Sequence, residues 1–123
     1  MTTASATPSN CIYASGNNTA GKENNSVTIS NCNIFNFFFS GVTDHAGINI
    51  QTGAYGWTIT GNSFYQTASR ALAGSEMDGI NIANTSGYGF VITNNYVGGS
   101  AASCGGSPLT ITGTAKFRGI RCS

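Results

Sequence analysis

The sequence contains very few charged residues. Asp, Glu, Lys and Arg make up 7% of its 123 residues, the formal net charge is +1, and there is one histidine. A protein that binds nucleic acid electrostatically presents a basic face, and this composition cannot supply one. Nucleic-acid binding is therefore not expected, and acid–base or metal chemistry has few groups to draw on.

Long apolar runs are also lacking. Runs such as Phe37-Phe38-Phe39 fall far short of the roughly 18 residues that a membrane span needs. The first ten residues have neither the basic start nor the apolar stretch of a signal peptide. If the natural protein is exported, its signal was removed or lies upstream. Hydrophobic residues make up 40% of the chain, so a folded core is expected rather than disorder.

The chain has four cysteines, and their spacing matches no zinc motif, which would need close pairs. They are Cys11, Cys32, Cys104 and Cys122. An even number of cysteines in a chain with few charges suggests an extracellular or cell-surface protein. Four cysteines allow three pairings, and the sequence does not choose among them.

The sequence repeats itself. GINIQTGAYGWTITGN at residues 47–62 returns as GINIANTSGYGFVITNN at residues 79–95. A third copy of the second half is found at residues 27–30, and a third copy of the first half at residues 119–122. Each unit alternates apolar and polar residues and is bounded by Gly, Asn or Ser, which is typical of short strands with one buried face. Residues 66–78 offer at most one loose helical turn.

Units this short cannot bury their apolar faces alone, so they are expected to stack on their copies. Equivalent positions would then lie above one another, about 4.8 Å apart. The sequence predicts two inward stacks of isoleucines: Ile29, Ile59 and Ile92, and Ile48, Ile80 and Ile120.

The GI-x-I strands at 47–50 and 79–82 and the x-T-I-T-x-N-x-F type strands at 57–64 and 90–97 resemble those of the right-handed parallel β-helix family. This family includes pectate lyases, polygalacturonases, phage tailspikes and bacterial surface proteins. The resemblance spans residues 25–122. It implies an all-β fold, a right-handed parallel β-helix or β-solenoid of about three to four coils with roughly 30–40 residues each. Residues 1–123 would form a single domain, with an irregular arm at 1–10, coils over 11–123, and loops near 16–25 and 98–108. It also implies a structural ladder of asparagines, Asn62 and Asn95, with Cys32 in the equivalent place of the first coil.

Glu76-Met77-Asp78-Gly79-Ile80 resembles the N-T-D-G-I motif of polygalacturonases, in which the Asp is a catalytic acid. The other motifs of that family are missing, and residues 84–105 contain no acid. Asp44, Glu76 and Asp78 are the catalytic candidates if the chain is a polysaccharide lyase or glycoside hydrolase fragment. In the other interpretation, the acids have a structural role: stacking of equivalent strand positions would place Glu76 beside Lys116, and Asp78 beside Arg118, as opposite charges on neighbouring strands. A Ca²⁺ ion could relieve the crowding of Asp44 and Glu76; no other cofactor is expected.

At least one phenylalanine of residues 35–39 should face outward, under a loop or in a surface that binds glycans or another subunit. The sequence thus predicts a non-catalytic extracellular module with a structural or adhesive role. Its uncapped ends would self-associate head to tail into a fibre, or join flanking coils of a longer surface protein. Cys11 and Cys122 would lie close across such a junction.

Overall fold

The computed structural model describes residues 7–39 and 44–123. Residues 1–6, most of the predicted N-terminal arm, lie outside the described part. The described residues form short strands and one 3-10 turn, η1 (Ala102–Cys104), so the fold is all-β. The strands are β1 (Asn10–Ala14), β2 (Asn24–Asn25), β3 (Thr28–Ser30), β4 (Asn33–Phe35), β5 (His45–Ile50), β6 (Ala54–Tyr55), β7 (Thr58–Thr60), β8 (Ser63–Tyr65), β9 (Arg70–Leu72), β10 (Met77–Ile82), β11 (Val91–Thr93), β12 (Tyr96–Val97), β13 (Ile111–Gly113) and β14 (Phe117–Cys122).

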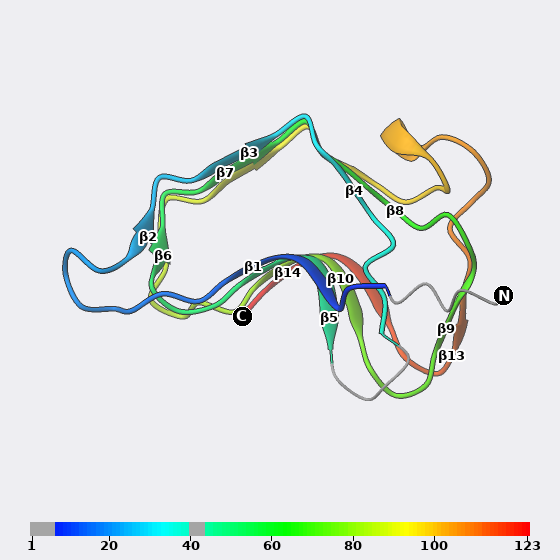
Figure 1. The fold of residues 1–123 in the computed structure, drawn as a ribbon, viewed down its shortest axis with the longest axis horizontal. Coiled ribbons are helices and arrows are strands. Elements are labelled where there is room, and N and C mark those ends of the chain that lie inside the picture. The colour runs from blue at the N-terminus through cyan, green and yellow to red at the C-terminus, as the bar shows by residue number, and fades with distance from the viewer. Residues whose placement is uncertain (1–6, 40–43) are drawn as a thin grey trace, which may run out of the picture.

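The strands recur in the same order along the chain, and we call each recurrence a pass. The first pass contains β1–β4, the second β5–β9 and the third β10–β13, and β14 begins a fourth. Each strand pairs in parallel with its equivalent in the next pass, which gives the sheets β1-β5-β10-β14, β3-β7-β11, β4-β8-β12, β2-β6 and β9-β13. Figure 1 shows the passes superimposed along one outline.

Paired positions lie between 30 residues apart, as from Asn33 to Ser63, and 41 residues apart, as from Arg70 to Ile111. The longer spacing arises in the third pass, where η1 and its flanking segment lie between β12 and β13. The loop predicted near 98–108 is this segment.

The largest sheet bends sharply within β5 and β10 (Figure 1). Gly47 and Gly79 occupy equivalent positions beside this bend. A Cβ added at Gly47 would lie 2.7 Å from the Gly79 carbonyl oxygen and 2.7 Å from the Phe64 ring. Glycine therefore lets the strand approach both neighbours, and the outer side of the bend is left concave.

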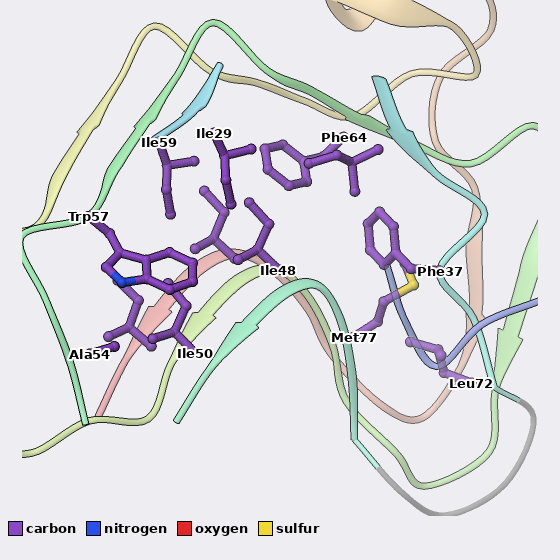
Figure 2. Close-up of a cluster of buried hydrophobic side chains, with 13 residues drawn as sticks. Ile29, Phe37, Ile48, Ile50, Ala54, Trp57, Ile59, Phe64, Leu72 and Met77 are labelled. Atoms are coloured by element: carbon purple, nitrogen blue, oxygen red, sulfur yellow. The ribbon is translucent and has the colours of Figure 1, made fainter. Parts of the chain in front are cut away.

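All three full passes contribute to one hydrophobic cluster (Figure 2). Trp57 closes one end of it, 3% exposed, with its indole N–H donating to the Asn24 carbonyl at 2.6 Å. Ile59 and Phe64, both in the second pass, are buried between the first and third passes. Burial is most complete in β5, β7, β8 and β10, because these strands have a paired strand on each side.

The two predicted isoleucine stacks have the expected register. Ile29 and Ile92 both pair with Ile59, and Ile48 and Ile120 both pair with Ile80. Ile120 differs from the expectation of an inward, covered residue: it is 49% exposed. The reason is that β14 is the last strand of its sheet, so no described strand covers its outer edge.

Candidate functional site

The three acidic residues singled out by the sequence lie together on neighbouring passes. Asp44 directly precedes β5, Glu76 directly precedes β10, and Asp78 is within β10. The Glu76 backbone N–H donates to Asp44 Oδ1 at 3.1 Å. Asp78 is only 1% exposed, whereas Asp44 is exposed. We call these three residues, together with Arg118 and Arg121 of β14, the polar corner.

Arg118 binds two carboxylates of the polar corner. Its Nε donates to Asp78 Oδ1 at 2.7 Å, its Nη2 donates to Asp78 Oδ2 at 3.3 Å, and Nη2 lies 2.5 Å from Glu76 Oε2. The hydrogen bond to Asp78 is the largest cause of a raised pKa of the Arg118 guanidinium. A bidentate partner compensates the buried charge of Asp78, which would be costly alone.

Arg121 binds the remaining carboxylate more loosely. Its Nη1 lies 3.5 Å from Asp44 Oδ2 and 3.9 Å from Glu76 Oε2. Asp78 pairs with Arg118 as predicted, and the register that pairs Met77 with Phe117 places Glu76 beside Lys116, but the ion pairs of Glu76 are with the arginines. The arginines of β14 reach Glu76 instead, while Lys116 precedes β14 and accepts the Met77 N–H with its carbonyl oxygen.

Glycoside hydrolysis needs one carboxylic acid that donates a proton and a second carboxylate that attacks or activates water. In the polar corner every carboxylate contacts a guanidinium, so an ion pair would have to break before a proton could be taken up. Within residues 7–39 and 44–123 there is no group of three or more His, Cys, Asp or Glu side chains that could hold a metal ion. Arg121 Nη1 lies 3.5 Å from Asp44 and 3.9 Å from Glu76, the two carboxylates between which Ca²⁺ was expected.

The predicted asparagine ladder joins the passes through the corner after β3, β7 and β11. Asn62 Nδ2 donates to the Ile29 carbonyl at 2.9 Å, and Asn95 Nδ2 repeats this with the Ile59 carbonyl at 2.8 Å. Asn62 Oδ1 accepts the Cys32 N–H at 2.9 Å, and Asn95 Oδ1 accepts the Asn62 N–H at 3.0 Å. Each asparagine thus bonds to the pass before its own.

A second pair of stacked asparagines, Asn49 and Asn81, was missed by the sequence analysis, and Asn49 also bonds to Asn10 of the neighbouring column. Asn49 Nδ2 donates to Asn10 Oδ1, and Asn81 Nδ2 donates to Asn49 Oδ1, both at 3.1 Å. Arg121 takes the equivalent place in β14. The signal was available, because Asn49 and Asn81 occupy the same place in the repeated GINI.

The aromatic run divides between interior and surface. Phe37 is 1% exposed, whereas Phe35 and Phe39 are 44% and 46% exposed. Phe35 stacks on Tyr65 of the next pass, with ring centroids 5.0 Å apart and planes 7° from parallel. The two rings occupy paired positions of β4 and β8, so the stacking of one pass on the next extends to the outer surface of the protein.

All four cysteines are free and exposed. Cys11 lies in β1 at the first edge of the largest sheet, and Cys122 lies in β14 at the last edge. The Cys11 thiol donates to the Phe35 carbonyl at 3.6 Å, and burial of the sulfur raises the pKa of this thiol. The even cysteine count suggested disulfides and hence an extracellular location, but the four cysteines form no disulfide that would support it.

The end of the stack where β14 lies is hollow. A recess of about 610 Å³ is lined by Ile82, Phe90, Ile92 and Cys122 together with Asn84, Thr85, Gly87 and Ser123. We call it the C-terminal recess. It lies beside β11, the edge strand of its sheet.

Comparison with protein-family models, curated proteins and solved structures found no match for this chain. Within the described ranges, no helix has the length and apolar character needed to cross a membrane.

Proposed function

We propose that the chain is a non-catalytic structural module, a right-handed parallel β-helix whose end faces bind further coils of the same kind. The observation that carries this proposal is the parallel pairing of equivalent strands in consecutive passes. Three full coils and the first strand of a fourth account for all the strands. The handedness follows from the general rule that crossovers between parallel strands of one sheet are right-handed.

The two end edges of the largest sheet match each other. Within the chain, Asn10, Ile12, Tyr13 and Ala14 head columns that end in Arg118, Ile120, Arg121 and Cys122. A second copy that continued these columns would place its Ile12 on Ile120 and its Tyr13 beside Arg121. Burial of Ile120 and a cation–π contact would both favour the junction. Such contacts are heterologous and do not close, so copies would form a fibre.

The same register argues against a disulfide across this junction. Cys122 would face Ala14 of the next copy, three residues from Cys11, which is about 10 Å along a strand. Disulfides need Cα atoms within about 7 Å of each other. Moving the register by three residues would turn the isoleucines outward. The proposed junction is therefore non-covalent.

An adhesive role at the cell surface or outside the cell belongs to this proposal and rests on composition. The adhesive role is supported by the small number of charged residues, by the exposed rings of Tyr13 and Tyr88, and by the polar outer faces of the strands.

The test is particle mass against concentration, by light scattering with negative-stain microscopy. We expect filaments or concentration-dependent oligomers for the wild-type chain and loss of association in Ile120→Lys. Ala71→Lys is the control, since Ala71 is exposed in β9, a strand of the second pass away from both ends of the largest sheet. A wild-type chain that stays monomeric at all concentrations would refute binding between copies.

Carbohydrate binding is the second candidate function. Phe35 is 44% exposed and stacks on Tyr65 with ring centroids 5.0 Å apart. A sugar ring would pack against the apolar face of these aromatic rings. If Glu76→Ala plus Asp78→Ala lowers only stability, and no oligosaccharide is bound or cleaved by the wild-type chain, this candidate fails.

A further inference from the structure

Two tyrosine rings from neighbouring passes contact each other at the corner of the outline where β2 and β6 lie (Figure 1). Tyr55 is the last residue of β6 in the second pass, and Tyr88 precedes β11 in the third pass. Their ring centroids lie 4.8 Å apart, and the ring planes are tilted by 33°. This distance is within the range of directly contacting aromatic pairs. We call these two residues the tyrosine pair.

The backbone holds the tyrosine pair together. The Gly56 N–H donates to the Tyr88 carbonyl at 2.9 Å, which fixes the third pass against the second directly beside the rings. Towards the first pass, the Ser26 N–H donates to the Tyr55 carbonyl at 3.0 Å. The Tyr55 hydroxyl donates to Asn18 Oδ1 at 3.5 Å. The ring contact is therefore a consequence of how consecutive passes stack within one chain.

Both rings of the tyrosine pair are accessible from solvent. Tyr88 is 71% exposed, and Tyr55 is partly exposed. Loss of one electron and one proton from a tyrosine phenol gives a phenoxyl radical, and two such radicals combine when their rings meet. Holding two reacting groups in contact raises their effective concentration by several orders of magnitude over a reaction between separate molecules. Coupling within the chain is therefore favoured at this corner.

The other tyrosines lack a tyrosine neighbour. The chain has five tyrosines, and none lies outside the described residues. Tyr65 stacks on Phe35, whose ring carries no hydroxyl group. Within residues 7–39 and 44–123, no ring contact joins Tyr13 or Tyr96 to another aromatic ring. The tyrosine pair is thus the place in the described structure where two phenols of one chain meet.

We propose that the tyrosine pair is an oxidative cross-linking site, at which a peroxide oxidant joins the second pass to the third. Each phenol gives up one electron and one proton, and the two radicals form a carbon–carbon bond between the ring carbons next to their oxygen-bearing carbons. The hydrogens of those two carbons move as protons to the phenol oxygens, so both rings regain aromaticity. Hydrogen peroxide takes up the two electrons and two protons released and leaves as two water molecules.

The link would supply what the cysteines do not. All four cysteines are free in this fold. A covalent bond between two passes restricts the unfolded chain in the way that a disulfide does, and so stabilises the folded state. The bond would also keep the third pass on the second when the protein is exposed to oxidants.

The test is oxidation of the purified chain by hydrogen peroxide, with a haem peroxidase as catalyst, after iodoacetamide has blocked the cysteines. The protein is kept dilute, so that coupling between molecules is slow. We expect a monomer that has lost two hydrogen atoms by mass spectrometry and shows dityrosine fluorescence. Tandem mass spectrometry should place the link between Tyr55 and Tyr88, and the urea unfolding midpoint of the linked monomer should rise.

Phenylalanine variants make the result specific, because they remove the hydroxyl group and keep the ring. Tyr55→Phe and Tyr88→Phe should each lower the yield of the intramolecular link about tenfold and abolish the rise in the midpoint. Tyr65→Phe and Tyr96→Phe are the matched controls and should keep both. The proposal is overturned if the wild-type monomer forms no link, if the link joins other tyrosines, or if Tyr88→Phe is linked as efficiently as the wild-type chain.

The mass of the linked species separates this site from association of copies. A link within monomers supports the proposal whether or not the chain also forms filaments, since both rings belong to one copy. Dityrosine found only in covalent dimers would mean that tyrosines meet between molecules, which overturns the proposal.

Discussion

At the residue scale, Asn62 is the side chain most tightly bound to both neighbouring passes. It is fully buried, and it bonds to Cys32 and Ile29 on one side and to Asn95 on the other. Hydrogen bonds that leave buried partners unsatisfied when removed contribute more than exposed ones. The asparagines therefore set the spacing of the passes at this corner as much as the isoleucines do.

We expect Asn62→Ala to lower the free energy of unfolding by about 3 kcal/mol, because buried partners in both adjoining passes lose their bonds. Chemical denaturation followed by circular dichroism measures it. Asn33→Ala is the control: Asn33 is exposed in β4, and its change should stay within about 0.5 kcal/mol. Equal losses in the two variants would contradict the ladder.

Cys11 should be the slowest of the cysteines to react with iodoacetamide near pH 8. Partial burial of its sulfur raises the pKa of this thiol above the ordinary value of 9.0, so less thiolate is present. The fold favours the protonated thiol, so this contribution to stability is complete below pH 9.0 and is lost as the pH rises through the raised value. Rates measured from pH 7 to 10 by peptide mapping test this; a Cys11 rate equal to that of Cys104 would disprove it.

At the element scale, the bend of β5 depends on Gly47. Gly47→Ala would force its Cβ against the Gly79 carbonyl and the Phe64 ring, which should cost about 2 kcal/mol. Gly119→Ala is the matched control, because the nearest atom, of Val97, would lie 3.8 Å from its Cβ. Denaturation midpoints of the two variants compare them directly, and a stable Gly47→Ala protein would mean that the bend has another cause.

The pairing of β10 with β14 depends on the Arg118–Asp78 ion pair. Arg118→Met leaves the buried Asp78 charge without its bidentate partner and should cost about 3–5 kcal/mol. Adding Asp78→Leu should recover most of this loss, because the uncompensated charge is then gone. Lys116→Met should have little effect, since Lys116 is exposed. If the double variant is as unstable as Arg118→Met, the pair is not what joins these strands.

The register of the strands could be predicted from the sequence because the repeats are nearly identical, and identical residues stack. The third pass shows where this fails. Residues 70–72 were expected to form at most a helical turn, yet they form β9, because β13 pairs with them from 41 residues away without any shared motif. Likewise, the alignment of repeats places residues in columns, but it does not show that long arginine side chains reach Glu76 from neighbouring columns.

At the scale of the whole molecule, the fold holds together without covalent links. All four cysteines are free and exposed in the described structure. We expect dithiothreitol to leave the urea unfolding midpoint unchanged, and Ellman's reagent to titrate four thiols without denaturant. Fewer than four reactive thiols, or a lower midpoint under reduction, would show that a disulfide forms.

The parallel pairing of every sheet has a consequence for growth. Successive passes are added along one direction of the stack, and all paired strands run parallel. The edge of the largest sheet at β1 and the edge at β14 are therefore chemically different. Two copies related by a two-fold axis would bring like edges together with their strands running in opposite directions, and the columns of isoleucine and asparagine could not continue. Any assembly that preserves the columns would therefore be vectorial, with a leading end and a trailing end that differ chemically.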